Sequence, residues 1–100
     1  MTRIVYSSRA LDDLTRLFQF IAGQDPKAAA ASVAAIRSAV EMLPQHPYAG
    51  RRVENAQRDI RELVISFGKT GYVALYRYLP VKGEVRVLAL RHQRELDFPH

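Results

Sequence analysis

Arg77 is the residue whose setting points most directly to binding chemistry. It shares the alternation of Val73 and Leu75 in a predicted strand from Tyr72 to Leu79, so a guanidinium stands on an otherwise apolar face. A guanidinium in such a place needs an anionic partner. Either Glu62 on the neighbouring strand supplies a structural ion pair, or Arg77 binds an anion from outside the chain. The sequence leaves both interpretations open.

The other residue types that could do chemistry carry weaker patterns. His46, His92 and His100 lack the i, i+4 spacing and the carboxylate neighbours of a metal site, so no metal is expected. His92 could transfer protons near neutral pH, although a histidine at a strand end is more often structural. Gly68-Lys69-Thr70 lacks the earlier glycine and the following helix of a phosphate-binding loop, and it predicts a hairpin turn instead. The absence of cysteine excludes disulfides, thiol catalysis and iron–sulfur clusters.

Positive charge is concentrated in the second half of the chain. The net charge of the 100 residues is +5, and residues 51–100, with ten basic and six acidic side chains, contribute +4 of it. Twelve of the fifteen basic residues are arginine. This balance suggests an acidic partner, which is either nucleic acid or an acidic protein segment, although an arginine-rich solvated surface explains it as well. A plain nucleic-acid-binding module is therefore one candidate function.

Two helices must precede this basic half. A short strand from Thr2 to Tyr6 is followed by Ser7 and Ser8, either of which can cap a helix that ends near Gly23. Asp12 and Asp13 lie in or near its first turn. The predicted apolar face of this helix consists of Leu11, Leu14, Phe18 and Ile21. A second helix begins with Asp25 as N-cap and Pro26 and stops by Pro44, and its stripe is Ala29, Val33, Ile36, Val40 and Leu43. The short connection predicts an antiparallel helix hairpin.

After an irregular loop up to Asp59, alternating residues predict a three-stranded antiparallel meander. Its strands are the segment around Leu63 to Phe67, the segment from Tyr72 to Leu79, which suits a central strand buried on both faces, and the segment from Val85 to Leu90. A polar tail runs from Arg91 to His100. The sequence thus predicts a single α+β domain over residues 1–100, with the helix hairpin on one face of a small antiparallel sheet and the other face largely open.

Several motifs together resemble the RelE/ParE superfamily of toxins from type II toxin–antitoxin modules. They are Ala10-Leu11-x-Asp13-Leu14, Asp25-Pro26-x-Ala28-Ala29, His46-Pro47-x-x-Gly50-Arg51, Arg61-Glu62-Leu63-Val64-Ile65, Tyr72-x-x-Leu75-Tyr76-Arg77 and Val87-Leu88-x-Leu90-Arg91-His92-Gln93-Arg94-Glu95. The similarity covers essentially the whole chain and implies the same α+β fold. The loop motif and the ending Arg91-His92-Gln93-Arg94 are more similar to the ParE-like, plasmid-stabilisation branch.

The two branches imply different activities. ParE-like members inhibit DNA gyrase without an established catalytic residue, and RelE-like members cleave mRNA on the ribosome. RelE-like enzymes carry basic residues on the sheet and often a tyrosine near the C-terminus, whereas the last tyrosine here is Tyr78 and the three lysines do not cluster. The resemblance therefore favours gyrase inhibition. If the chain is a ribonuclease instead, the expected set is Arg61, Arg77 and His92.

The resemblance also implies partners and surfaces. The expected partner is a cognate antitoxin, of a ribbon-helix-helix type whose disordered C-terminal segment folds on binding. No cofactor, no membrane and a cytoplasmic location are expected. Target contacts are expected at Arg77, Arg91, His92, Arg94 and Glu95, and antitoxin contacts at Leu14, Phe18, Ile21, Arg51, Arg52, Arg61 and Arg86.

Overall fold

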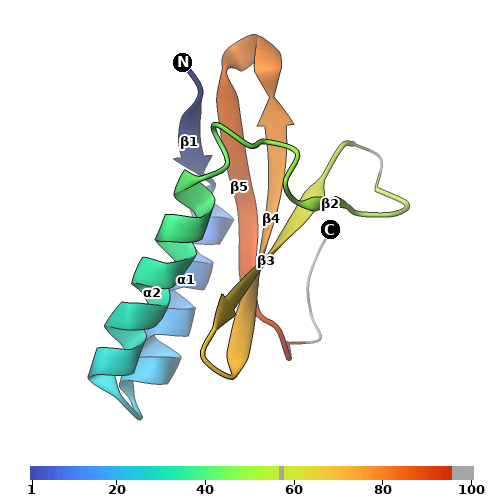
Figure 1. Cartoon of the computed structure of the whole chain (residues 1–100). Coiled ribbons are helices and arrows are strands. Elements are labelled where there is room, and N and C mark those ends of the chain that lie inside the picture. Colours follow the sequence, from blue (N-terminus) through green and yellow to red (C-terminus); the bar gives the residue numbers. More distant parts are fainter. Residues whose placement is uncertain (57, 96–100) are drawn as a thin grey trace.

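Two helices lie against one face of a five-stranded sheet in the computed structural model, which describes residues 1–56 and 58–95 (Figure 1). In chain order the elements are β1 (Arg3–Tyr6), α1 (Ser8–Ala22), α2 (Pro26–Glu41), β2 (Arg51–Arg52), β3 (Arg61–Phe67), β4 (Thr70–Leu79), a 3₁₀ turn (Pro80–Lys82) and β5 (Glu84–His92). This arrangement confirms the predicted α+β fold. Residues 96–100 of the predicted tail, with Phe98, Pro99 and His100, lie outside the described residues.

Both helices begin where their capping residues predict. The Ser7 hydroxyl accepts a hydrogen bond from the backbone N–H of Ala10 at 3.0 Å. The Asp25 carboxylate accepts from the N–H groups of Lys27 and Ala28 at 3.1 and 3.2 Å, with Pro26 at the first helical position. Neither helix in the described part of the chain is long and apolar enough to cross a membrane.

The buried face of α1 differs from the predicted stripe. Ala10, Asp13 and Leu17 are the buried residues, and only Leu14 and Ile21 of the predicted face pack against the core. Leu11 and Phe18 are exposed instead. Each residue turns the helix by about 100°, so a shift of one position moves a side chain from the core toward solvent. The pattern misplaced the face because Ala10 and Asp13 give no strong apolar signal, although Ala10 lets α1 approach closely.

The sheet has the strand order β1-β5-β4-β3-β2. The antiparallel meander of β3, β4 and β5 is confirmed, and β4 is its central strand, buried on both faces as predicted. Two features differ from the wholly antiparallel prediction. β1 pairs in parallel with β5, because the chain returns through the helix pair before it reaches the meander. The two-residue β2 pairs with β3 and is too short for alternation to reveal.

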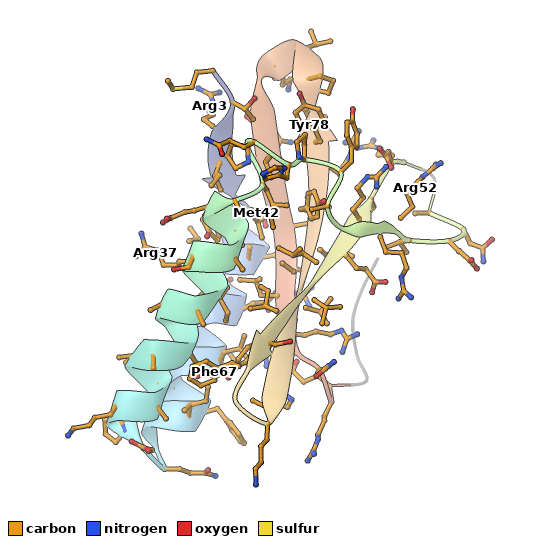
Figure 2. All side chains as sticks on the ribbon, in the orientation of Figure 1. Arg3, Arg37, Met42, Arg52, Phe67 and Tyr78 are labelled. Atoms are coloured by element: carbon orange, nitrogen blue, oxygen red, sulfur yellow. The ribbon has the colours of Figure 1, made fainter. Side chains whose placement is uncertain are left out.

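The two faces of the sheet differ in what covers them. The helices cover the face that carries Tyr72, Ala74 and Tyr76, which pack in one core cluster with Ile36, Val40, Leu43 and others. Phe67 points from β3 toward this helix pair (Figure 2). The opposite face, called here the helix-free face, carries the alternate residues of the same strands: Glu62, Val64, Val73, Leu75, Arg77, Glu84, Arg86, Ala89 and Arg91. No helix among the described residues lies on it (Figure 1).

Candidate functional site

The three residues expected for RNA cleavage do not come together. Arg77 lies on the helix-free face of β4, and His92 is opposite Tyr72 on the helix side of β5. Residues 72 and 77 are five positions apart on one strand, which separates them by about 17 Å. Arg61 is opposite Tyr76 on β3, near Arg77 along the sheet but turned toward a loop. An acid, a base and a charge stabiliser for one phosphate would need to converge within hydrogen-bonding reach.

Arg61 binds the loop that precedes β2. Its guanidinium donates to the carbonyl of Gly50 at 3.0 Å and lies 4.9 Å from the centre of the Tyr48 ring. The Tyr76 hydroxyl holds the same loop, since it accepts from the N–H of Gly50 at 2.9 Å and donates to the carbonyl of Pro47 at 2.8 Å. Burial raises the pKa of Tyr76, which keeps this donor protonated. Arg61 therefore has a structural role that accounts for its position.

Both ring nitrogens of His92 are engaged. Nδ1 accepts the backbone N–H of Arg94 at 3.1 Å, and Nε2 makes a short contact with the Thr70 hydroxyl. An accepting Nδ1 carries no proton, so the neutral ring has its proton on Nε2, directed at Thr70. The ring also packs edge-on against Tyr72, with centroids 5.5 Å apart. These contacts orient His92 as part of the strand end, facing the helix pair.

The residues after His92 are held against α1. Glu95 accepts from Arg16 at 2.7 Å and from the backbone N–H of His92 at 3.3 Å. Burial alone would raise the pKa of Glu95, but these hydrogen bonds outweigh it and hold the pKa below its ordinary value. The Arg91 guanidinium donates to the carbonyls of residues 92, 93 and 95. The segment from Arg91 to Glu95 is therefore ordered by its own hydrogen bonds, and Arg94 is left exposed on it.

We expect acid to release Glu95 from Arg16. Because the folded pKa of Glu95 is lowered, its contribution to stability is fully present above the unfolded value near 4.5 and is lost as the pH falls below it. Glu95→Gln should therefore destabilise the chain at neutral pH by less than about 1 kcal/mol, since the pair is partly exposed. Urea unfolding of both proteins from pH 7 to pH 3 measures the difference, which should vanish at the acid end. A difference that stays constant across this range would contradict the expectation.

A groove of about 750 Å³ lies beside this segment. Its lining comes from the second half of α1, the first half of α2 and the ends of β3, β4 and β5 near residues 67, 70 and 92. These parts of the elements lie at the lower end of Figure 1. Leu17, Phe20, Ile21, Phe67 and Tyr72 form its apolar part, and Thr70, His92, Arg94 and Glu95 line its polar part. Phe20 is 71% exposed and was absent from the predicted surface, because it lies off the apolar stripe that the sequence suggested. A groove of this composition suits an amphipathic segment of a partner.

The residues expected to contact an antitoxin occupy separate parts of the surface. Leu14 and Ile21 are half-buried against the core, and Phe18 is exposed on α1. Arg51 and Arg52 form ion pairs with Glu62 at 3.1 Å and with Asp59 at 3.3 Å. The structure brings Arg51 and Arg52 together with Arg61 at the β2–β3 corner, where Arg52 points away from the helices (Figure 2). Arg86 lies apart from them on β5.

Sequence reasoning missed one aromatic side chain at this corner. Tyr48 is 60% exposed, meets Tyr78 edge-on at a centroid distance of 5.4 Å and has the Arg61 guanidinium above its ring. Exposed tyrosine beside arginine is typical of the residues that dominate protein interfaces. The only signal in the sequence was its place between Pro47 and Gly50 in the loop motif.

The centre of the helix-free face is apolar. Val64 is 57% exposed there, whereas Val73, Leu75 and Ala89 on the neighbouring strands are buried, so this face is less open than the sequence predicted. Arg91 lies opposite Val73 on this face, and Arg77 and Arg86 lie opposite each other further along the same strands. Among residues 1–56 and 58–95, no group of three histidine or acidic side chains could hold a metal ion.

The chain is similar to known proteins in sequence and in overall fold. Residues 4–97 match the family described as ParE toxin of type II toxin–antitoxin system, parDE. The chain is 37% identical over 95 residues to Toxin RelE3 of Caulobacter vibrioides, covering 95% of this chain and 98% of that protein. The structure is similar to the chromosomal ParDE system of P. aeruginosa, with a TM-score of 0.73, 19% identity and 92% and 96% of the two chains covered. It is also similar to the intact E. coli RelBE toxin–antitoxin complex, with a TM-score of 0.62, 14% identity and coverage of 95% and 100%.

Proposed function

Since this chain belongs to the ParE toxin family of type II toxin–antitoxin systems, we propose that it inhibits DNA gyrase and so blocks replication. The observation that supports binding rather than catalysis is the separation of Arg61, Arg77 and His92. Arg61 is held by a loop carbonyl, and His92 lies about 17 Å along the sheet from Arg77 and on its other side. Cleavage of RNA requires these groups at one phosphate.

We place the contact with gyrase at the end of β5 and the segment that follows it. Arg91, His92, Arg94 and Glu95 are neighbours there, and their hydrogen bonds to each other and to Arg16 fix the backbone. An ordered surface loses little conformational entropy when it binds. Arg94 is the exposed cation of this set. A target of this kind places the protein in the cytoplasm.

A cognate antitoxin neutralises the toxin in this proposal. The similar solved structures include an intact toxin–antitoxin complex and a ParDE system, which supports such a partner. The groove beside Phe20 and the exposed face of α1 with Phe18 offer apolar surface to a segment that folds on binding. A ribbon-helix-helix domain would carry the DNA-binding part of that antitoxin.

Ribosome-dependent mRNA cleavage is the competing function. It is favoured by one observation, the similarity over nearly the whole chain to a protein named RelE3. Against it, the centre of the helix-free face carries Val64, Val73 and Leu75 where basic residues would have to hold RNA.

Arg94→Ala is expected to weaken inhibition of gyrase supercoiling, raising the toxin concentration for half-inhibition about five- to fiftyfold. The loss is graded because an interface contact is removed and no catalytic group is lost. Arg37→Ala is the matched control, since Arg37 is an exposed arginine on α2 that points away from the sheet (Figure 2). Wild-type toxin that leaves supercoiling unaffected at stoichiometric excess would overturn the proposed target.

A further inference from the structure

Two arginines face each other directly across the sheet on the helix-free face. Arg77 of β4 is the register partner of Arg86 of β5. Arg86 in turn pairs with Val5 of β1, the strand at the edge of the sheet (Figure 1). Directly opposed residues of antiparallel strands have their Cβ atoms about 4.5–5.5 Å apart. Like charges in this arrangement repel unless anions lie close to both of them.

The carboxylates of this region have arginine partners, and one of these partners is Arg86 itself. Glu84 accepts from Arg86 at 2.8 Å and also pairs with Arg3 at 3.5 Å. Glu62, the partner that the sequence offered to Arg77, binds Arg51 at 3.1 Å. The structural pair between Arg77 and Glu62, one of the two alternatives from the sequence, is therefore not formed.

Arg77 is left without a partner among the described residues. It makes no hydrogen bond or ion pair there, and its Nε–H is buried without an acceptor. A desolvated N–H of a charged group without an acceptor is unfavourable. In the free chain the Nε–H of Arg77 therefore still lacks the hydrogen bond that would offset its desolvation. Of the two interpretations that the sequence left open, the ion pair with Glu62 is absent, and the binding of an external anion is the one that we pursue.

We propose that Arg77 and Arg86 form a carboxylate-binding site for an aspartate or glutamate side chain of the antitoxin. This inference rests on the proposed function and assigns Arg77 to the antitoxin rather than to the toxic target. Arg86 uses Nε and Nη2 on Glu84 and keeps Nη1, so Arg77 and the Nη1 group of Arg86 can both donate to one carboxylate, which has two oxygens. Binding also removes the repulsion between the arginines, so the site favours a partner that remains bound.

The surroundings favour a single carboxylate over a nucleic acid backbone. Leu79 and Val5, both half-buried, lie on the same face, so apolar surface adjoins the two cations. Glu84 is bound to Arg86 and Arg3 with its side chain only 4% exposed, so of Arg3, Arg77 and Arg86 only Arg77 lacks a partner among the described residues. One such cation suits a single carboxylate better than a row of phosphates. Arginine next to apolar side chains is typical of protein interfaces.

Affinity for the antitoxin tests the site. The probe is the full-length antitoxin encoded beside this chain, titrated into wild-type toxin, Arg77→Gln, Arg77→Lys and the control Arg37→Gln. We expect Arg77→Gln to raise Kd about ten- to hundredfold, mainly through faster dissociation. Arg77→Lys should restore only part of the affinity, because lysine keeps the charge without the planar fork. The NMR signal of the Arg77 Nε–H should appear shifted and protected from exchange in the complex.

The outcomes separate this site from the proposed function. The unfolding free energy of free Arg77→Gln should not fall, because the substitution relieves repulsion, and a variant that unfolds would assign Arg77 a structural role instead. Equal Kd values for wild type, Arg77→Gln and Arg37→Gln would overturn the site and leave the toxin assignment intact. No antitoxin binding by the wild type would overturn both. If Arg77→Gln loses binding to a short DNA duplex while its antitoxin affinity is unchanged, the site binds nucleic acid, and the proposal of an antitoxin carboxylate is overturned.

Discussion

Asp13→Ala is expected to lower the free energy of unfolding by about 2–4 kcal/mol. Asp13 is only 4% exposed, and its carboxylate accepts the backbone N–H of Leu90 at 2.9 Å. It also accepts from Arg9 at 3.3 Å and pairs with Arg16 at 3.5 Å. The pairing of β1 with β5 ends at Val87, so no strand supplies an acceptor for Leu90 and the helix does so instead. Alanine would leave the buried N–H of Leu90 unpaired and remove this hydrogen bond between α1 and β5.

Urea unfolding measures this effect, and the slope of the unfolding free energy against urea concentration checks that unfolding is two-state. Asp12→Ala is the matched control, since the neighbouring aspartate is exposed on the same helix, and it should change stability by less than about 0.5 kcal/mol. Asp13→Asn keeps an acceptor for Leu90 and should recover part of the loss. Equal stability of Asp13→Ala and Asp12→Ala would show that the link between α1 and β5 contributes nothing.

Gly50→Ala is expected to destabilise the chain by about 1–3 kcal/mol. A Cβ atom there would lie 2.7 Å from the carbonyl oxygen of Glu62 and 2.7 Å from Cε1 of Tyr76. Relief of this overlap must move the loop away from β3 and break the hydrogen bond between Gly50 and the Tyr76 hydroxyl. The Arg61 contact to the Gly50 carbonyl would be strained at the same time. The melting temperature and the unfolding free energy should both fall.

Gly23→Ala provides the control for this substitution. Gly23 has helical backbone angles, and a Cβ there would have its nearest neighbour at 3.6 Å, an ordinary contact. That variant should be as stable as the wild type or slightly more so, because alanine restricts the unfolded chain. A Gly50→Ala protein as stable as Gly23→Ala would mean that the loop can move without cost.

The elements of the fold could be predicted because each carries a local signal. Asp25 with Pro26 marks one helix start, and alternation marks the three strands of the meander. β2 and the parallel pairing of β1 could not be predicted, since both depend on which distant strand lies alongside. Asp13 shows the same limit. Its position suggested only a favourable charge near a helix start, whereas the folded chain uses it as a tertiary hydrogen-bond acceptor.

The candidate site was predictable by residue type but not by geometry. The sequence singled out Arg77 and named its two alternatives, and only the fold revealed that Glu62 is taken by Arg51. His92 and Arg77 were grouped as one set because both belong to the predicted meander or to its end. In the antiparallel register His92 of β5 lies opposite Tyr72 of β4, five positions along that strand from Arg77, and the two side chains lie on opposite faces of the sheet. Phe20 and Tyr48 were missed because exposure of a single aromatic residue has no periodic signature.

Toxicity by binding to gyrase, without catalysis, is tested most directly by paired assays on one preparation of the wild-type chain. One reaction contains DNA gyrase with relaxed plasmid, and the other contains ribosomes programmed with mRNA. The proposal predicts that supercoiling is lost in the first reaction, in proportion to the toxin added, while the mRNA in the second stays at full length. Cleaved mRNA from the wild type, abolished in an Arg77→Lys protein that melts at the wild-type temperature, would contradict the proposal and identify the chain as a ribosome-dependent ribonuclease.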